Sequence, residues 1–104
     1  MIEVLPEAMT ELFEAVDWYE EQREGLGEEL FDAIERAMGR IMLQGPRAFP
    51  RVLEDPRTRR VLVQRFPYAV IYADEATLVR IVAFAHLKRR PAYWSNRVPL
   101  KDKG

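Results

Sequence analysis

Apolar side chains in the first half of the chain recur every three or four positions from Pro6 onward. This spacing predicts an amphipathic helix, with Pro6 suited to its first turn. Its stripe consists of Met9, Leu12, Phe13, Val16 and either Tyr19 or Glu20. Gly25-Leu26-Gly27 breaks the pattern, and a second helix is predicted to run up to Gly45-Pro46. The second stripe consists of Leu30, Phe31, Ile34, Ala37, Met38, Ile41 and Met42. Because the connector is short, we expect an antiparallel helical hairpin.

Strand patterns flank this hairpin. Residues 2–5 alternate as a short first strand, and later strands are predicted over residues 60–66, 69–72 and 78–86. The stretch 46–56 contains three prolines and predicts an ordered but irregular loop. Short turns, among them Asp74-Glu75-Ala76, make the last three strands antiparallel neighbours, and the nearly all-apolar last strand should be central.

This order of elements predicts an α+β fold in which the helical hairpin packs on one face of a small antiparallel sheet. We expect one domain over residues 1–95 and a basic C-terminal tail over residues 96–104, with fraying from residue 95 onward.

The composition of the chain excludes several kinds of functional site. The 104 residues include no cysteine and one histidine, His86. The lack of cysteine excludes a disulfide scaffold and a thiolate nucleophile, and a single histidine excludes a multi-histidine metal site. No apolar run approaches the roughly 20 residues that span a bilayer, and the N-terminus lacks the layout of a signal peptide. A soluble cytoplasmic protein is expected.

Charge is unevenly distributed along the chain. Residues 1–35 carry twelve acids and one base, a net charge of −11, and residues 36–104 carry fifteen bases and five acids, a net charge of +10, which together give −1. Thirteen of the sixteen bases are arginine, which suits bidentate contacts with carboxylate or phosphate. A polarised surface would steer an anionic partner. The simpler interpretation is that the two halves neutralise each other across the fold.

Several short motifs resemble one protein family. The run Trp18-Tyr19-Glu20-Glu21-Gln22, followed by Gly25-Leu26-Gly27 and Phe31, resembles the helical hairpin of the RelE/ParE toxins of type II toxin–antitoxin systems. Pro46, Phe49-Pro50, the stretch Arg65-Phe66-Pro67-Tyr68-Ala69-Val70-Ile71-Tyr72, Ala85-His86 and Arg89-Arg90-Pro91 extend the similarity. The resemblance covers about residues 1–95 and implies the same strand, two-helix and antiparallel-sheet fold.

The resemblance also implies a function. The hairpin looks most like the ParE-type branch, often labelled plasmid stabilisation proteins, whose members arrest growth by inhibiting DNA gyrase without catalysis. RelE-like members instead cut messenger RNA on the ribosome. A third hypothesis is a repurposed member that binds its partner and poisons nothing. In each case the implied partner is a cognate antitoxin, usually an acidic segment, in a hetero-oligomer and away from any membrane. None of the three hypotheses implies a metal or an organic cofactor, so we expect neither.

A nuclease needs a base, an acid and a cation for the phosphate. His86 suits either proton role, with Arg65, Arg89 and Tyr93 as its helpers. The simpler interpretation is that His86 caps a strand end. Two departures weaken the nuclease hypothesis: Ala69 follows Tyr68 where RelE-like nucleases carry a base, and Leu87 follows His86 where YoeB-like members carry a tyrosine.

Basic residues of the second half are the candidates for binding the antitoxin or the target. These are Arg59, Arg60, Arg65, Arg80, His86, Arg89 and Arg90. Strand alternation places Arg80 and His86 on one face, and we expect the helices to cover the opposite face, leaving both open. With the faces swapped, Arg80 would pair with an acid of the first helix.

Aromatic residues carry two interpretations as well. Tyr68, Tyr72, Tyr93 and Trp94 would stack on bases in a nucleic-acid site, or would pack within and around a small sheet. Trp18 and Tyr19 are neighbours on a helix and cannot both face the core, so we expect one of them to be exposed, at a partner site or at a partly covered rim.

Overall fold

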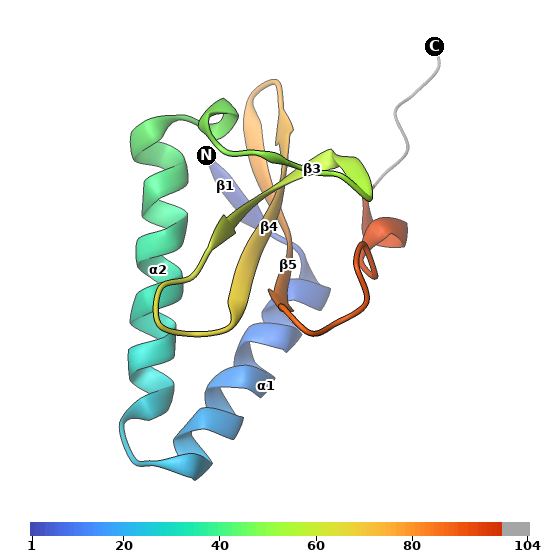
Figure 1. The fold of residues 1–104 in the computed structure, drawn as a ribbon. Coiled ribbons are helices and arrows are strands. Elements are labelled where there is room, and N and C mark those ends of the chain that lie inside the picture. Colours follow the sequence, from blue (N-terminus) through green and yellow to red (C-terminus); the bar gives the residue numbers. More distant parts are fainter. Residues whose placement is uncertain (99–104) are drawn as a thin grey trace.

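The computed structural model describes residues 1–98 and contains two helices and one five-stranded sheet (Figure 1). The helices are α1 (Pro6–Gln22) and α2 (Leu26–Gln44), and the 3-10 turns are η1 (Pro46–Ala48) and η2 (Ser95–Arg97). The strands are β1 (Ile2–Val4), β2 (Arg51–Val52), β3 (Asp55–Leu62), β4 (Tyr68–Glu75) and β5 (Leu78–His86). Their order in the sheet is β1-β5-β4-β3-β2, which confirms the predicted α+β fold and the interior position of β5. No helix within residues 1–98 is long and apolar enough to cross a membrane.

The helical hairpin buries its small residues rather than its largest ones. Alanines at positions 8, 15, 33 and 37 join Leu12, Leu30, Ile34 and Ile41 in the core. Phe13, Phe31 and Met42 were predicted within the apolar stripes but lie exposed at their edges. The stripe prediction is wrong at these three positions, because alanines allow the helices to approach the sheet closely and push bulkier neighbours to the flank.

The connector between the helices is built around two glycines and one carboxylate. Gly25 has a φ of 88°, a left-handed conformation that favours glycine. The Glu20 carboxylate accepts hydrogen bonds from the backbone N–H groups of Gly25 at 2.9 Å and Gly27 at 3.0 Å. A Cβ atom on Gly27 would come within 2.6 Å of the Val16 carbonyl oxygen. Gly27 is therefore the close-contact point of the hairpin.

The sheet departs from prediction around its third strand. The stretch predicted as an irregular loop contains β2 and the start of β3, and residues 63–66 form a turn instead of continuing the strand. Arg65 in this turn has a φ of 74°, which a strand cannot accommodate. The prediction for β4 was also too short, since the strand includes Asp74 and Glu75. β3, β4 and β5 are antiparallel neighbours as predicted, and β1 pairs parallel to β5.

A β-bulge in β5 reverses which face its side chains point to. Ile71 pairs with Ala83, but the next residue, Tyr72, pairs with Ile81, so Val82 is an extra residue. Before the bulge Ile81 packs with the helices, and after it Phe84 does so. Val82, Ala83 and Ala85 belong to a second cluster on the opposite face.

The bulge overturns the prediction that Arg80 and His86 share an open face. Val79 and Ile81 point to the helices, so Arg80 points to the opposite face. His86 lies two positions after Phe84 and therefore points to the same face, the one that the helices cover. There its ring contacts Tyr68. The strict alternation used for the prediction does not hold across an extra residue.

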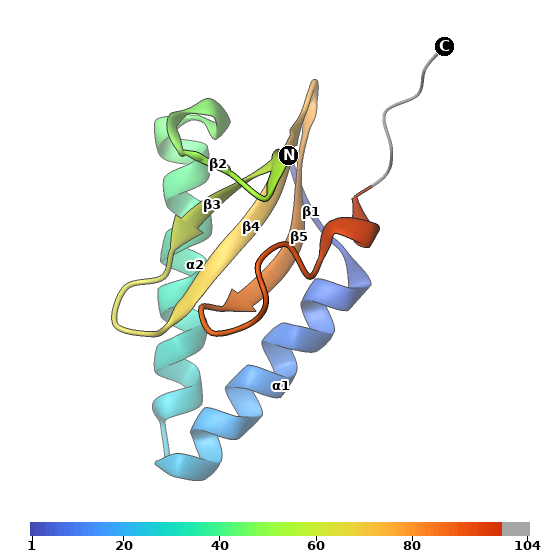
Figure 2. The ribbon, with the colours of Figure 1, turned by 45° about the vertical axis from the view of Figure 1, so that its right-hand side comes forward.

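The second face of the sheet is covered by the C-terminal segment. Figure 2 shows this segment running beside the sheet after β5. Its Trp94 and Val98 are buried against small residues of β4 and β5. Residues 96–98 were predicted to belong to a tail that frays from residue 95, yet they pack on the domain, because Arg97 and Val98 both have partners there. The folded part of the chain thus extends past residue 95. The rest of the predicted tail, residues 99–104, lies outside the described residues.

Candidate functional site

The outer edge of β5 is completed by side chains from both ends of the chain. β1 pairs with β5 only as far as Ile81, which also accepts the Leu5 N–H at 3.0 Å. Beyond that point the Phe84 N–H donates to Glu11 at 3.1 Å, and Arg97 donates to the Val82 carbonyl oxygen at 3.1 Å. Glu11 and Arg97 therefore take the place of a neighbouring strand at the bulge.

Tyr93 belongs to the same network. Its hydroxyl donates to Glu11 at 2.6 Å, and Arg97 lies 5.2 Å from its ring centroid. Burial and this hydrogen bond to a carboxylate raise the pKa of Tyr93 well above its usual value. The phenol therefore stays protonated near neutral pH, and its proton is directed at Glu11.

His86 ends β5 with its ring half-exposed. The ring lies edge-to-face with Tyr68, at 5.1 Å between centroids. Its Nδ1 accepts the backbone N–H of Lys88 at 3.0 Å, which leaves Nε2 as the nitrogen available to other groups. This is the arrangement of a ring that caps a turn.

The arginines proposed to assist His86 are held by other partners. Arg89 lies over the Tyr93 ring at 4.0 Å from its centroid. Arg65 pairs with Glu29 on α2 at 3.0 Å, and this hydrogen bond lowers the pKa of the Glu29 carboxyl. The structure thus joins Tyr93 to Arg89 but directs the charge of Arg65 toward α2.

Arg59 and Arg80 also have structural partners. Arg59 donates to the Phe49 carbonyl oxygen at 2.7 Å and so fixes the loop after η1. Arg80 makes ion pairs with Glu75 of β4 and Glu3 of β1, and not with an acid of the first helix. In this structure its charge is therefore paired within the sheet.

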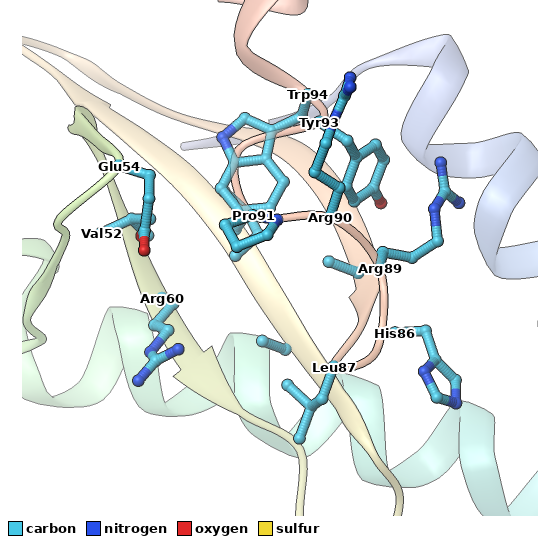
Figure 3. Close-up of a pocket in the computed structure, with 13 residues that line it drawn as sticks. Val52, Glu54, Arg60, His86, Leu87, Arg89, Arg90, Pro91, Tyr93 and Trp94 are labelled. Carbon is cyan, nitrogen blue, oxygen red and sulfur yellow. The ribbon is translucent and has the colours of Figure 1, made fainter.

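Four candidate arginines have no carboxylate partner within residues 1–98: Arg59, Arg60, Arg89 and Arg90. Arg59 donates to a carbonyl oxygen and Arg89 lies over an aromatic ring, which leaves Arg60 and Arg90 of this group. Both are exposed, and both line a pocket of about 140 Å³ between the second face of the sheet and the C-terminal segment (Figure 3). His86 lines the rim of this pocket, and in Figure 3 its ring is turned away from Arg60 and Trp94.

The aromatic residues mostly serve packing. Tyr72 is buried and donates to the Pro46 carbonyl oxygen, and burial raises its pKa to about 12. Tyr68 is half-buried, and burial raises its pKa too. Tyr19 packs edge-to-face on Phe66 while Trp18 is 55% exposed, as expected for two helical neighbours. Trp18 and Phe13, which is 56% exposed, are thus the large aromatic rings of α1 that a partner can reach.

Sequence reasoning missed Glu11, Arg97 and the role of Trp94. Glu11 is one of twelve acids in the first 35 residues, so nothing in its spacing sets it apart. Arg97 lies in the stretch taken for a tail. The one clue was Trp94, because a large apolar side chain rarely belongs to a frayed end.

No family model and no curated protein matches this chain. A solved structure does: a chain of the "Chromosomal ParDE TA system from P. aeruginosa" superposes with a TM-score of 0.74. The match covers 84% of this chain and 95% of that chain, at 14% sequence identity. At this identity the similarity establishes a shared fold.

Proposed function

We propose that this chain is the toxin of a type II toxin–antitoxin pair and that it acts by binding, as a ParE-like inhibitor of DNA gyrase. The observation that carries the proposal is the shared fold with a chain of a ParDE system over almost the whole of both chains. The hairpin motifs that resemble the ParE-type branch support the same assignment. Gyrase and the antitoxin would both be met in the cytoplasm.

Binding is favoured over catalysis by the surroundings of His86. General acid–base catalysis on RNA needs a positioned cation beside the proton-transferring group. Here Arg65 is paired with Glu29, and Arg89 stacks on Tyr93. The Tyr93 hydroxyl donates its hydrogen bond to Glu11, and its raised pKa keeps it protonated. An inhibitor that only binds its target needs none of these groups free.

An acidic antitoxin segment is the partner we propose for the second face of the sheet. Arg60 and Arg90 are exposed there and have no carboxylate partner within the described residues. Charge-assisted hydrogen bonds to arginine are among the stronger polar contacts. The helical side carries most of the chain's acids, so an acidic segment would be steered away from it.

The alternative is a ribosome-dependent endoribonuclease. One observation favours it: the His86 ring is half-exposed and stands edge-to-face with Tyr68, so a nucleotide could reach Nε2. Under this alternative a backbone or ribosomal group would have to supply the charge that Arg65 and Arg89 do not.

Growth of bacterial cells after induction of the chain without an antitoxin tests the proposal. We expect arrest with the unaltered chain and with His86→Phe, which keeps the ring against Tyr68. Arg36→Gln, an exposed change on α2, is the matched control. A loss of toxicity by orders of magnitude in His86→Phe alone would support the nuclease, and normal growth with the unaltered, folded chain would leave only the non-poisoning partner-binding hypothesis.

A further inference from the structure

We propose that the outer side of the helical hairpin is a docking surface for a basic, amphipathic segment of a protein partner. Five apolar side chains form this surface, which we call the hairpin patch: Met9, Phe13, Phe31, Met38 and Met42. The inference goes beyond the proposed function, because it assigns a second partner, opposite in charge to the acidic antitoxin segment, to the other side of the molecule.

The two phenylalanines of the patch lie at the same level of the seam between the helices. A Cβ atom on Gly27 would come within 2.6 Å of the Val16 carbonyl oxygen, so α1 and α2 touch at these two residues. Phe13 precedes Val16 by about one turn, and Phe31 follows Gly27 by about one turn. Because the helices run in opposite directions from their connector (Figure 1), both steps lead the same way along the seam. Phe13 is 56% exposed and Phe31 is 38% exposed, which places both rings on the solvent side.

The methionines continue the patch along both helices. Met9 lies four positions before Phe13, while Met38 and Met42 lie seven and eleven positions after Phe31, and these spacings keep side chains on one face of a helix. Met9 and Met38 are half-buried and pack against the core, whereas Met42 is exposed. The patch therefore extends over about 16 Å of α2. Single exposed apolar residues are common, but a contiguous group of them is typical of an interaction site.

Unpaired acids border the patch on both helices. Asp17, Glu28 and Glu35 each lie one turn from one of the two phenylalanines and are exposed. None of the three makes an ion pair within residues 1–98. The one base among residues 1–35 is Arg23, and it pairs with Glu29. The surroundings of the patch are thus negative, with no basic side chain of the hairpin left to neutralise them.

This charge selects the occupant of the patch. An acidic antitoxin segment and a nucleic acid both bring further negative charge and would be repelled. The same holds for the hairpin of a second copy, since residues 1–35 carry a net charge of −11. Lysine or arginine side chains beside an apolar stripe would instead meet the free carboxylates while the stripe covers the phenylalanines. The occupant is therefore an amphipathic helix with apolar residues every three or four positions and bases between them.

Nuclear magnetic resonance of the methionine methyl groups tests the patch in the whole chain. The chain has four methionines, of which three belong to the patch, and Met1 is the internal reference. The probe is a blocked 14-residue peptide with leucines every three or four positions and lysines at all others. We expect saturable shifts at Met9, Met38 and Met42, each assigned through its leucine variant, and none at Met1. A peptide of the same composition, reordered so that the leucines share no face, should bind at least tenfold more weakly.

Two aromatic substitutions locate the contact. Phe13→Gln should weaken binding of the ordered peptide at least tenfold. Trp18→Gln is the matched control, because Trp18 is 55% exposed on the same helix but lies outside the patch, and it should leave binding unchanged. Circular dichroism of both variants checks that they are folded.

Three outcomes would overturn the proposal. Equal binding of the ordered and reordered peptides would mean a general attraction between bases and acids. Tighter binding of a peptide with glutamate in place of every lysine would assign the patch to an acidic partner. A dimer in sedimentation of the chain alone, abolished by Phe13→Gln, would assign it to a second copy. None of these measurements involves toxicity, so a non-toxic chain that binds the ordered lysine peptide refutes the proposed function alone.

Discussion

Glu11 and Arg97 lie 86 positions apart in the sequence and meet through two parallel hydrogen bonds of 3.0 Å each. Their side chains are 14% and 17% exposed. Glu11 also accepts from the Phe84 N–H and the Tyr93 hydroxyl. One carboxylate therefore ties the first helix to the bulged strand and to the C-terminal segment, and so holds the wall of the Trp94 pocket in place.

Removing this carboxylate should cost considerable stability. Glu11→Gln leaves the Arg97 charge mostly buried and unpaired, and breaking a buried pair in this way costs about 3 kcal/mol. Urea unfolding followed by circular dichroism measures the change. Glu14→Gln, an exposed site one turn away on the same helix, is the control and should change stability by about 0.5 kcal/mol or less. Equal effects of the two substitutions would show that the network contributes nothing.

Two glycines of α2 should respond to alanine in opposite directions. Gly27→Ala places a Cβ within 2.6 Å of a backbone oxygen of α1, so the hairpin must open and stability should fall by about 1–3 kcal/mol. Gly39 has nothing within 4 Å of an added Cβ, and Gly39→Ala should raise stability by about 0.5–1 kcal/mol through helix propensity. Thermal unfolding of both variants distinguishes them. A stable Gly27→Ala variant would mean that the helices are not in close contact there.

Tyr72 should make the chain less stable in alkali. Its pKa is raised by burial from 10.0 to about 12 in the folded chain, so the stabilising contribution is complete below pH 10 and is lost as the pH rises through 12. The loss across this window is about 2–3 kcal/mol. The free energy of unfolding of the unaltered chain should therefore fall more steeply between pH 10 and 12 than that of Tyr72→Phe. Parallel slopes would place the hydroxyl in solvent.

The helices and the antiparallel strands could be predicted because their causes are local. Pro6, the two glycines around Leu26 and the Gly45-Pro46 stop fix the helix limits, and the last strand was predicted with its observed bounds. Local pattern could not show the bulge at Val82, since an extra residue in one strand is defined only by its partner strand. That single residue decided which way His86 faces.

The candidate site was predictable as a list of cations but not as an arrangement. Arginines in a basic half of the chain look alike in sequence, yet among the described residues Arg65 and Arg80 have carboxylate partners whereas Arg60 has none. Pairing depends on contacts across strands and helices, which composition does not encode. The sequence does not show which acids accept these pairs either, because Glu29 and Glu75 look like the other acids of the chain.

The order in which DNA and protein synthesis stop is the most direct test of the central claim. Cells induced to make the chain without an antitoxin are pulse-labelled with thymidine and with methionine over the first minutes. A gyrase inhibitor predicts that thymidine incorporation falls first while methionine incorporation continues. If methionine incorporation falls first and messenger RNAs are found cut, the chain is a nuclease, His86 has a catalytic role, and the gyrase account is wrong.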